Sequence, residues 1–120
     1  MKKLIWVGSS KKDLLKLPDA VIDFMGNGLQ LAQNGKKDKW AKPLTGFGGI
    51  DVMELIDTDI SGTYRAVYTV RMQHAIFVLH VFQKKSKHGI ATAKQDIDLI
   101  KSRLKLAEAI YEKEFYGKKK

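Results

Sequence analysis

The chain has no cysteine among its 120 residues and only two prolines. Without cysteine, disulfide bonds and thiolate metal sites are excluded. No apolar run approaches the roughly 20 residues that a membrane-spanning helix needs. The apolar stretch at residues 4–7 is also shorter than the core of a secretory signal, which takes ~7–15 residues. We therefore expect a protein that stays out of membranes and acts in the cytoplasm.

Motifs of several large enzyme classes are also missing. The chain contains no Gly-x-Gly-x-x-Gly and no Walker A sequence, the usual phosphate-binding loops. Its three histidines, His74, His80 and His88, are scattered, and no His-Glu-x-x-His pair exists. We accordingly expect neither a metal site nor another cofactor.

Positive charge is the strongest compositional feature. Twenty-two Lys and Arg stand against 13 Asp and Glu, so the net charge is +9. Half of the basic residues lie in residues 83–120, after the apolar centre of the chain. Such a balance indicates a polyanionic partner, namely nucleic acid, an anionic membrane surface or an acidic protein. The alternative is a lysine-rich surface that serves only solubility.

Hydrophobic periodicity predicts one α+β domain over residues 1–120 with the element order β-α-α-β-β-β-α. Residues 3–7 favour a strand. A short helix over residues 10–17 would begin at Ser10, whose hydroxyl is suited to an N-cap. A longer helix opens at Pro18 and ends near residue 34. Its apolar residues recur at helical spacing and form one stripe: Val21, Met25, Gly28, Leu29 and Ala32.

The second half of the chain predicts three consecutive strands followed by a helix. The strands cover residues 51–57, 64–72 and 75–82, after a loop at residues 36–49. Thr92 and Gln95 have capping-box spacing at the start of the last helix. Residues 118–120 would be a frayed basic tail. The whole is a small antiparallel-rich sheet packed on an N-terminal α-hairpin and a C-terminal helix.

Strand alternation brings candidate functional residues together. If residues 73–74 form a two-residue turn, Arg65 lies opposite Phe82, and Val67 lies opposite His80. Arg65, His80 and Lys84 then share one face near the end of the sheet. A turn longer by one residue would move His80 and Lys84 to the other face. The predicted cluster depends on that register.

A group of Arg and Lys side chains at the end of a sheet suits phosphate. Guanidinium groups bind phosphate oxygens with paired hydrogen bonds, and cations stabilise the charge that develops during phosphoryl transfer. RNA needs no metal for cleavage, because its own 2′-hydroxyl is the nucleophile. In the basic loop that follows, His88 is the better candidate to carry a proton.

Each candidate also has a structural interpretation, which the sequence leaves open. Arg65 could pair with Glu54 or Asp57 on the neighbouring strand. His80, among apolar residues, could be a buried structural histidine. The lysines of residues 84–87 could belong to an ordinary solvated loop.

Five segments in order resemble the RelE/ParE toxin superfamily, and within it the HigB-like phage-derived proteins. They are residues 17–18, 41–44, 54–55, 62–68 and 78–86, which read Leu-Pro, Ala-Lys-Pro-Leu, Glu-Leu, Gly-Thr-Tyr-Arg-Ala-Val-Tyr and Val-Leu-His-Val-Phe-Gln-Lys-Lys-Ser. The resemblance implies a toxin of a type II toxin–antitoxin system that binds the ribosomal A site and cleaves mRNA. It also implies a helix-turn-helix antitoxin as partner. The free toxin is compatible with a homodimer.

By position, the resemblance implies phosphate binding and transition-state stabilisation by Arg65, and phosphate contacts by Lys84 and Lys85. With His88 as the proton carrier of the basic loop, the expected catalytic residues are Arg65, Lys84, Lys85 and His88. The expected RNA-binding residues are Arg71, Lys87, Lys42 and His80.

Two departures from the family pattern matter. Many relatives read Glu-Leu-Arg where Ile56 follows Leu55 here, so one cationic contact is absent. Some relatives use a tyrosine after the basic loop, and residues 83–92 contain none. Either His88 takes the place of that tyrosine, or cleavage is weak or lost. Two other functions therefore stay open: a ParE-like gyrase inhibitor without nuclease activity, and a basic nucleic-acid-binding module. Fold alone does not decide among them.

Overall fold

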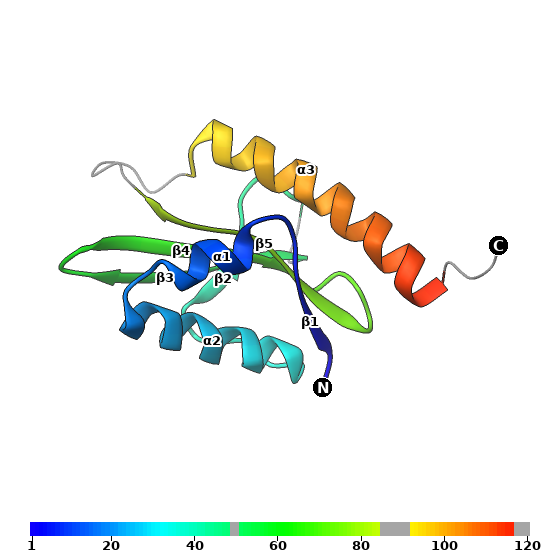
Figure 1. Cartoon of the computed structure of the whole chain (residues 1–120), viewed down its shortest axis with the longest axis horizontal. Helices are drawn as coiled ribbons and strands as arrows, with labels where there is room; N and C mark the ends of the chain where they lie inside the picture. Colours follow the sequence, from blue (N-terminus) through cyan, green and yellow to red (C-terminus); the bar gives the residue numbers. More distant parts are fainter. Residues whose placement is uncertain (49–50, 85–91, 117–120) are drawn as a thin grey trace.

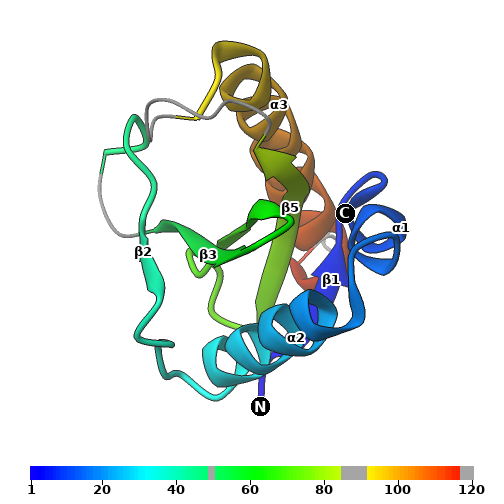
Figure 2. The ribbon, with the colours of Figure 1, turned by 90° about the vertical axis from the view of Figure 1, so that its left-hand side faces the viewer.

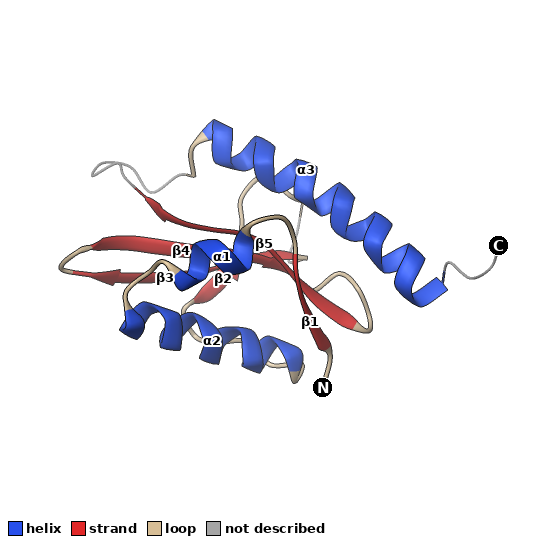
Figure 3. Ribbon diagram, viewed as in Figure 1, coloured by secondary structure: helices blue, strands red, loops and turns tan. Residues whose placement is uncertain are grey.

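A computed structural model of the chain describes residues 1–48, 51–84 and 92–116. It shows a five-stranded sheet with helices on both faces (Figures 1 and 2). The elements are β1 (Lys3–Trp6), α1 (Ser10–Leu15), α2 (Asp19–Gln33), β2 (Ala41–Pro43), β3 (Val52–Asp59), β4 (Gly62–Thr69), β5 (Ala75–Lys84), α3 (Lys94–Tyr111) and a π-helical turn, Glu112–Tyr116. The predicted α+β class is confirmed, because strands β2 to β5 follow one another between helices α2 and α3 (Figure 3).

The short strand β2 was not predicted, because its segment was expected to be a loop. Three residues are too few to show a period-two pattern, and Pro43 is untypical of a strand. The strand exists because Ala41, Lys42 and Pro43 pair antiparallel with Leu55, Glu54 and Met53 of β3. At the edge of a sheet, a proline costs no ladder hydrogen bond if its nitrogen faces outward.

The sheet order is β1-β5-β4-β3-β2, with β1 parallel to β5 and the other neighbouring pairs antiparallel. Strand β5 therefore lies between β1 and β4 and is covered on both faces. Seven of its residues in a row, 75–81, are buried. A strand covered on both faces needs a continuous apolar sequence rather than an alternating one, which explains its composition.

Two hydrophobic cores flank the sheet. On one face α1 and α2 pack against Leu55, Ala66 and Val78, among others. On the other face α3 packs against a second set that includes Val67 and Phe77. The buried residues of α2 are the five of the predicted stripe, which confirms it. Within the part of the chain that the structure describes, no helix is long and apolar enough to cross a bilayer.

Both predicted helix caps are wrong. Ser10 is fully buried, and its hydroxyl donates to the carbonyl of Val78 at 3.1 Å instead of capping α1. Helix α3 begins at Lys94 after Ala93, without a side-chain cap. The hydroxyl of Thr92 instead accepts a hydrogen bond from Arg65 Nη1 at 3.4 Å. In both cases a tertiary partner replaced the local one that the sequence pattern indicated.

Two glycines of α2 allow a matched test of packing. A Cβ on Gly28 would lie 2.6 Å from the nearest side-chain carbon of Leu55, whereas a Cβ on Gly26 would meet nothing within 4 Å. We expect Gly26→Ala to stabilise the protein by about 0.5–1 kcal/mol through helix propensity. Gly28→Ala should instead destabilise the protein by up to about 2 kcal/mol, because overpacking costs about 1–3 kcal/mol and offsets the same gain. Urea unfolding measures both; equal stabilisation by the two variants would contradict this packing.

Candidate functional site

The register of β4 against β5 places the candidate residues, and it rests on a β-bulge. Near the hairpin end Tyr68 pairs with Val78, but next along the strand Val67 pairs with His80, so Leu79 is an extra residue. The predicted two-residue turn is wrong, because residues 70–74 connect the strands. Without a bulge, this longer connection would have turned the side chain of His80 to the face of the sheet opposite Arg65. The bulge restores the predicted pairing from Val67 onward.

One face of the sheet consequently carries a row of polar and charged side chains on the α3 side. Direct cross-strand partners project from the same face. Strand β4 places Arg65 opposite Phe82, and its Thr63 lies opposite Lys84. Strand β2 contributes Lys42, which lies opposite Glu54 of β3. We call this set of side chains the charged row. It consists of Lys42, Glu54, Arg65, His80, Phe82 and Lys84.

Arg65 is the most buried cation of the charged row. Its Nη1 lies 2.7 Å from Oε1 of Glu54, and the two side chains are only 4% and 5% exposed. The alternative that Arg65 pairs with Glu54 is thus confirmed. A second donor contact reaches Thr92, just before α3. The ion pair therefore ties β3, β4 and the start of α3 together.

His80 forms the second pair of the site. Its Nε2 lies 2.8 Å from Oδ1 of Asp96 on α3, and the side chain of His80 is 10% exposed. The ring stacks on Phe82, with centroids 4.4 Å apart and planes at 17°. The other ring nitrogen, Nδ1, is buried without a hydrogen-bond partner among residues 1–48, 51–84 and 92–116. This arrangement matches the alternative of a buried, hydrogen-bonded histidine.

The remaining predicted residues divide into three groups. Lys42 is exposed and Lys84 is half-buried, so the charged row has a cation near each end. Arg71 lies beyond the opposite end of β4 and pairs with Asp51 and Glu108, so it does not join the others. Lys85, Lys87 and His88 lie outside the described residues.

Sequence reasoning missed the two carboxylates as members of the site. The sequence pattern indicates Glu54 only as a pairing partner for Arg65, and it does not single out Asp96. The signal for Glu54 was present, since a glutamate between Met53 and Leu55 in a predicted strand needs a buried partner. No local signal links Asp96 to His80, because only the packing of α3 on the sheet brings them together.

The arrangement combines cations with two carboxylate-containing pairs on one face of the sheet. Lys42 and Lys84 can contact a phosphate backbone, because ammonium groups on half-buried or exposed side chains reach solvent. An imidazole hydrogen-bonded to a carboxylate is a common proton-transfer pair. Among the side chains that the structure describes, no three His, Asp or Glu residues gather closely enough to hold a metal ion.

Comparison with known proteins identifies relatives. The family model for phage-derived Gp49-like proteins matches residues 12–105. The solved structure of the isolated E. coli RelE toxin is similar, with a TM-score of 0.54 and 18% identity over 85% of this chain and 98% of that one. A free E. coli RelE mutant with two arginines changed to alanine gives 0.53 and 17% over 88% and 96%. A search of curated protein sequences returned no match.

Proposed function

The chain belongs to the family of phage-derived Gp49-like proteins and has the fold of the RelE toxin; on that premise we propose that it is the toxin of a type II toxin–antitoxin system. The finer proposal is that it acts as an endoribonuclease on mRNA in the ribosome. The family match carries the proposal, because it covers most of the chain, including all of the described charged row. The net charge of +9 supports a nucleic-acid target.

The proposed reaction is attack of an RNA 2′-hydroxyl on the neighbouring phosphorus. The 2′-oxygen forms a bond to phosphorus while the 5′-oxygen of the next nucleotide leaves, so the products are a 2′,3′-cyclic phosphate and a 5′-hydroxyl. A base must take the 2′ proton, an acid must protonate the leaving oxygen, and cations must balance the charge on the phosphate.

Lys84 and Lys42 are proposed to contact the phosphate. Arg65 was predicted to be catalytic, and its burial against Glu54 favours a positioning role that holds the carboxylate and Thr92 in place. His80 with Asp96 is proposed to support proton transfer at the same face.

The predicted roles of three loop residues remain part of the proposal. Lys85 is proposed as a catalytic phosphate contact, Lys87 as an RNA contact and His88 as a proton carrier. The proposed partners are the ribosome, its mRNA and a helix-turn-helix antitoxin, all in the cytoplasm.

A translating extract tests this function. We expect the purified protein to cut a reporter mRNA when ribosomes translate it, and to leave the same mRNA intact when initiation is blocked. The cut ends should carry 5′-hydroxyl groups, because the 5′-oxygen is the leaving group. Intact mRNA in the translating extract, together with slowed DNA supercoiling by gyrase, would instead establish the non-catalytic alternative.

A further inference from the structure

A pocket of about 440 Å³ opens on the face of the sheet opposite the charged row. It lies between the C-terminal end of α2, strand β2 and the ends of β3 and β4. Apolar side chains supply much of its wall, namely Ala32, Pro43, Met53 and Val70. Its volume is in the range of small-molecule sites, roughly 300–1,000 Å³. The charged row does not contribute to its lining.

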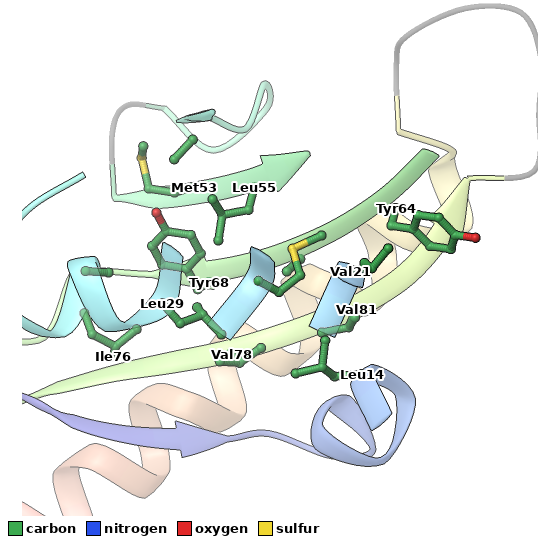
Figure 4. Close-up of a cluster of buried hydrophobic side chains, with 14 residues drawn as sticks. Leu14, Val21, Leu29, Met53, Leu55, Tyr64, Tyr68, Ile76, Val78 and Val81 are labelled. Atoms are coloured by element: carbon green, nitrogen blue, oxygen red, sulfur yellow. The ribbon is translucent and has the colours of Figure 1, made fainter. Parts of the chain in front are cut away.

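One buried polar group faces this pocket. Tyr68 is 1% exposed and lines the pocket. Figure 4 shows its hydroxyl on the side of Met53, away from Leu29 and Val78. Its hydroxyl makes no hydrogen bond to any residue that the structure describes, yet the oxygen is not among the side-chain atoms that are wholly shut off from solvent. The hydroxyl can therefore bond to an acceptor that enters the pocket, either water or a group of a ligand.

The protonation state of Tyr68 defines what the ligand must offer. Burial, and secondarily the negative charge of Asp38, raise the pKa of Tyr68 to about 12. The phenol therefore keeps its proton at neutral pH. A protonated phenol donates a hydrogen bond. The complementary ligand group is therefore a hydrogen-bond acceptor, such as a carboxylate oxygen.

Positive charge surrounds the same opening. Lys2, Lys36 and Lys37 line the pocket, and none of its described lining residues is acidic, so these three charges stand against the one negative charge, Asp38, that acts on Tyr68. Lys37 donates to the carbonyl of Ala41 at 3.1 Å, and Lys2 to that of Met72 at 3.4 Å. Each ammonium has three donors, so both retain donors for an anion. Lys36, which follows the end of α2, is exposed.

We propose that this pocket is a binding site for a small amphiphilic carboxylate, an acid with one apolar chain. The carboxylate accepts a hydrogen bond from Tyr68 and lies in the positive field of the three lysines. The apolar body packs against Pro43, Met53 and the rest of the apolar wall. This site is separate from the proposed RNA site, so either proposal can fail without the other.

Calorimetric titration of the full chain with sodium decanoate tests the site. We expect one site per chain, and we expect the neutral analogue 1-decanol to bind at least tenfold more weakly, because it lacks the charge. Tyr68→Phe should weaken decanoate binding roughly tenfold, the value of one hydrogen bond to a charged group. The same variant should keep the melting temperature, because no residue that the structure describes bonds to the hydroxyl.

A charge-matched pair of double variants locates the anion. Lys36→Gln with Lys37→Gln should weaken decanoate binding severalfold and reduce its dependence on salt. Lys11→Gln with Lys12→Gln removes the same charge from exposed residues of α1 and should leave binding unchanged. The proposal is overturned if decanoate does not bind at millimolar concentration, or if Tyr68→Phe binds it as tightly as the original chain.

Discussion

Replacing Arg65 with alanine is expected to lower the free energy of unfolding by about 3–5 kcal/mol. The substitution leaves the carboxylate of Glu54, whose side chain is 5% exposed, without its cation. An unpaired charge in that position is far more costly than the ion pair was favourable, because burial removes the water that would otherwise solvate it. Urea unfolding followed by circular dichroism measures the loss.

A double variant separates the charge effect from the loss of packing. Arg65→Met with Glu54→Leu removes both charges and keeps most of the side-chain volume, so it should recover most of the lost stability. If Arg65→Ala alone costs less than about 1 kcal/mol, the buried pair in this structure is wrong. Loss of toxicity in Arg65→Ala would therefore not by itself identify a catalytic residue.

Lys84→Gln is expected to reduce mRNA cleavage about a hundredfold, the usual effect of removing one group that stabilises charge in a transition state. Lys84 is half-buried at one end of the charged row, and urea unfolding of the variant checks that it keeps the fold. The measurement is the rate of reporter cleavage in a translating extract. Lys84→Arg should retain more activity than Lys84→Gln because it keeps the charge.

Lys105→Gln is the matched control for that experiment. Lys105 is exposed on α3, and its replacement changes the net charge by the same amount. We expect cleavage within twofold of the original chain. Equal rates for Lys84→Gln and Lys105→Gln would remove Lys84 from the proposed site and leave only a general electrostatic effect.

Elements with strong periodicity were predictable from sequence. The stripe of α2 was identified correctly because all five apolar residues face a single core, so local spacing and tertiary packing agree. In α3, Ile100, Leu104 and Ala107 likewise recur at helical spacing and are buried. The strands β3 to β5 followed from their β-branched and aromatic residues.

Features that depend on distant partners were not predictable. The hydroxyls of Ser10 and Thr92 bond to Val78 and Arg65, far away in the sequence. Capping rules consider only local partners and therefore failed at both.

The register of the candidate site was predicted correctly for a wrong reason. The assumed two-residue turn does not exist, but the extra residue Leu79 in β5 compensates for the longer connection. A bulge of this kind has no reliable sequence signal, because it is decided by packing on both faces of the sheet. The pairing of Arg65 with Glu54 was open as one of two alternatives, since Asp57 lay at similar distance along the same strand.

Mapping the 5′ ends of cellular messages after brief induction of this chain tests the central claim most directly. Cleavage of translated mRNA should create new 5′-hydroxyl ends inside coding sequences, and these ends should vanish when translation initiation is blocked before induction. Growth arrest with an unchanged set of message ends would contradict the proposed endoribonuclease.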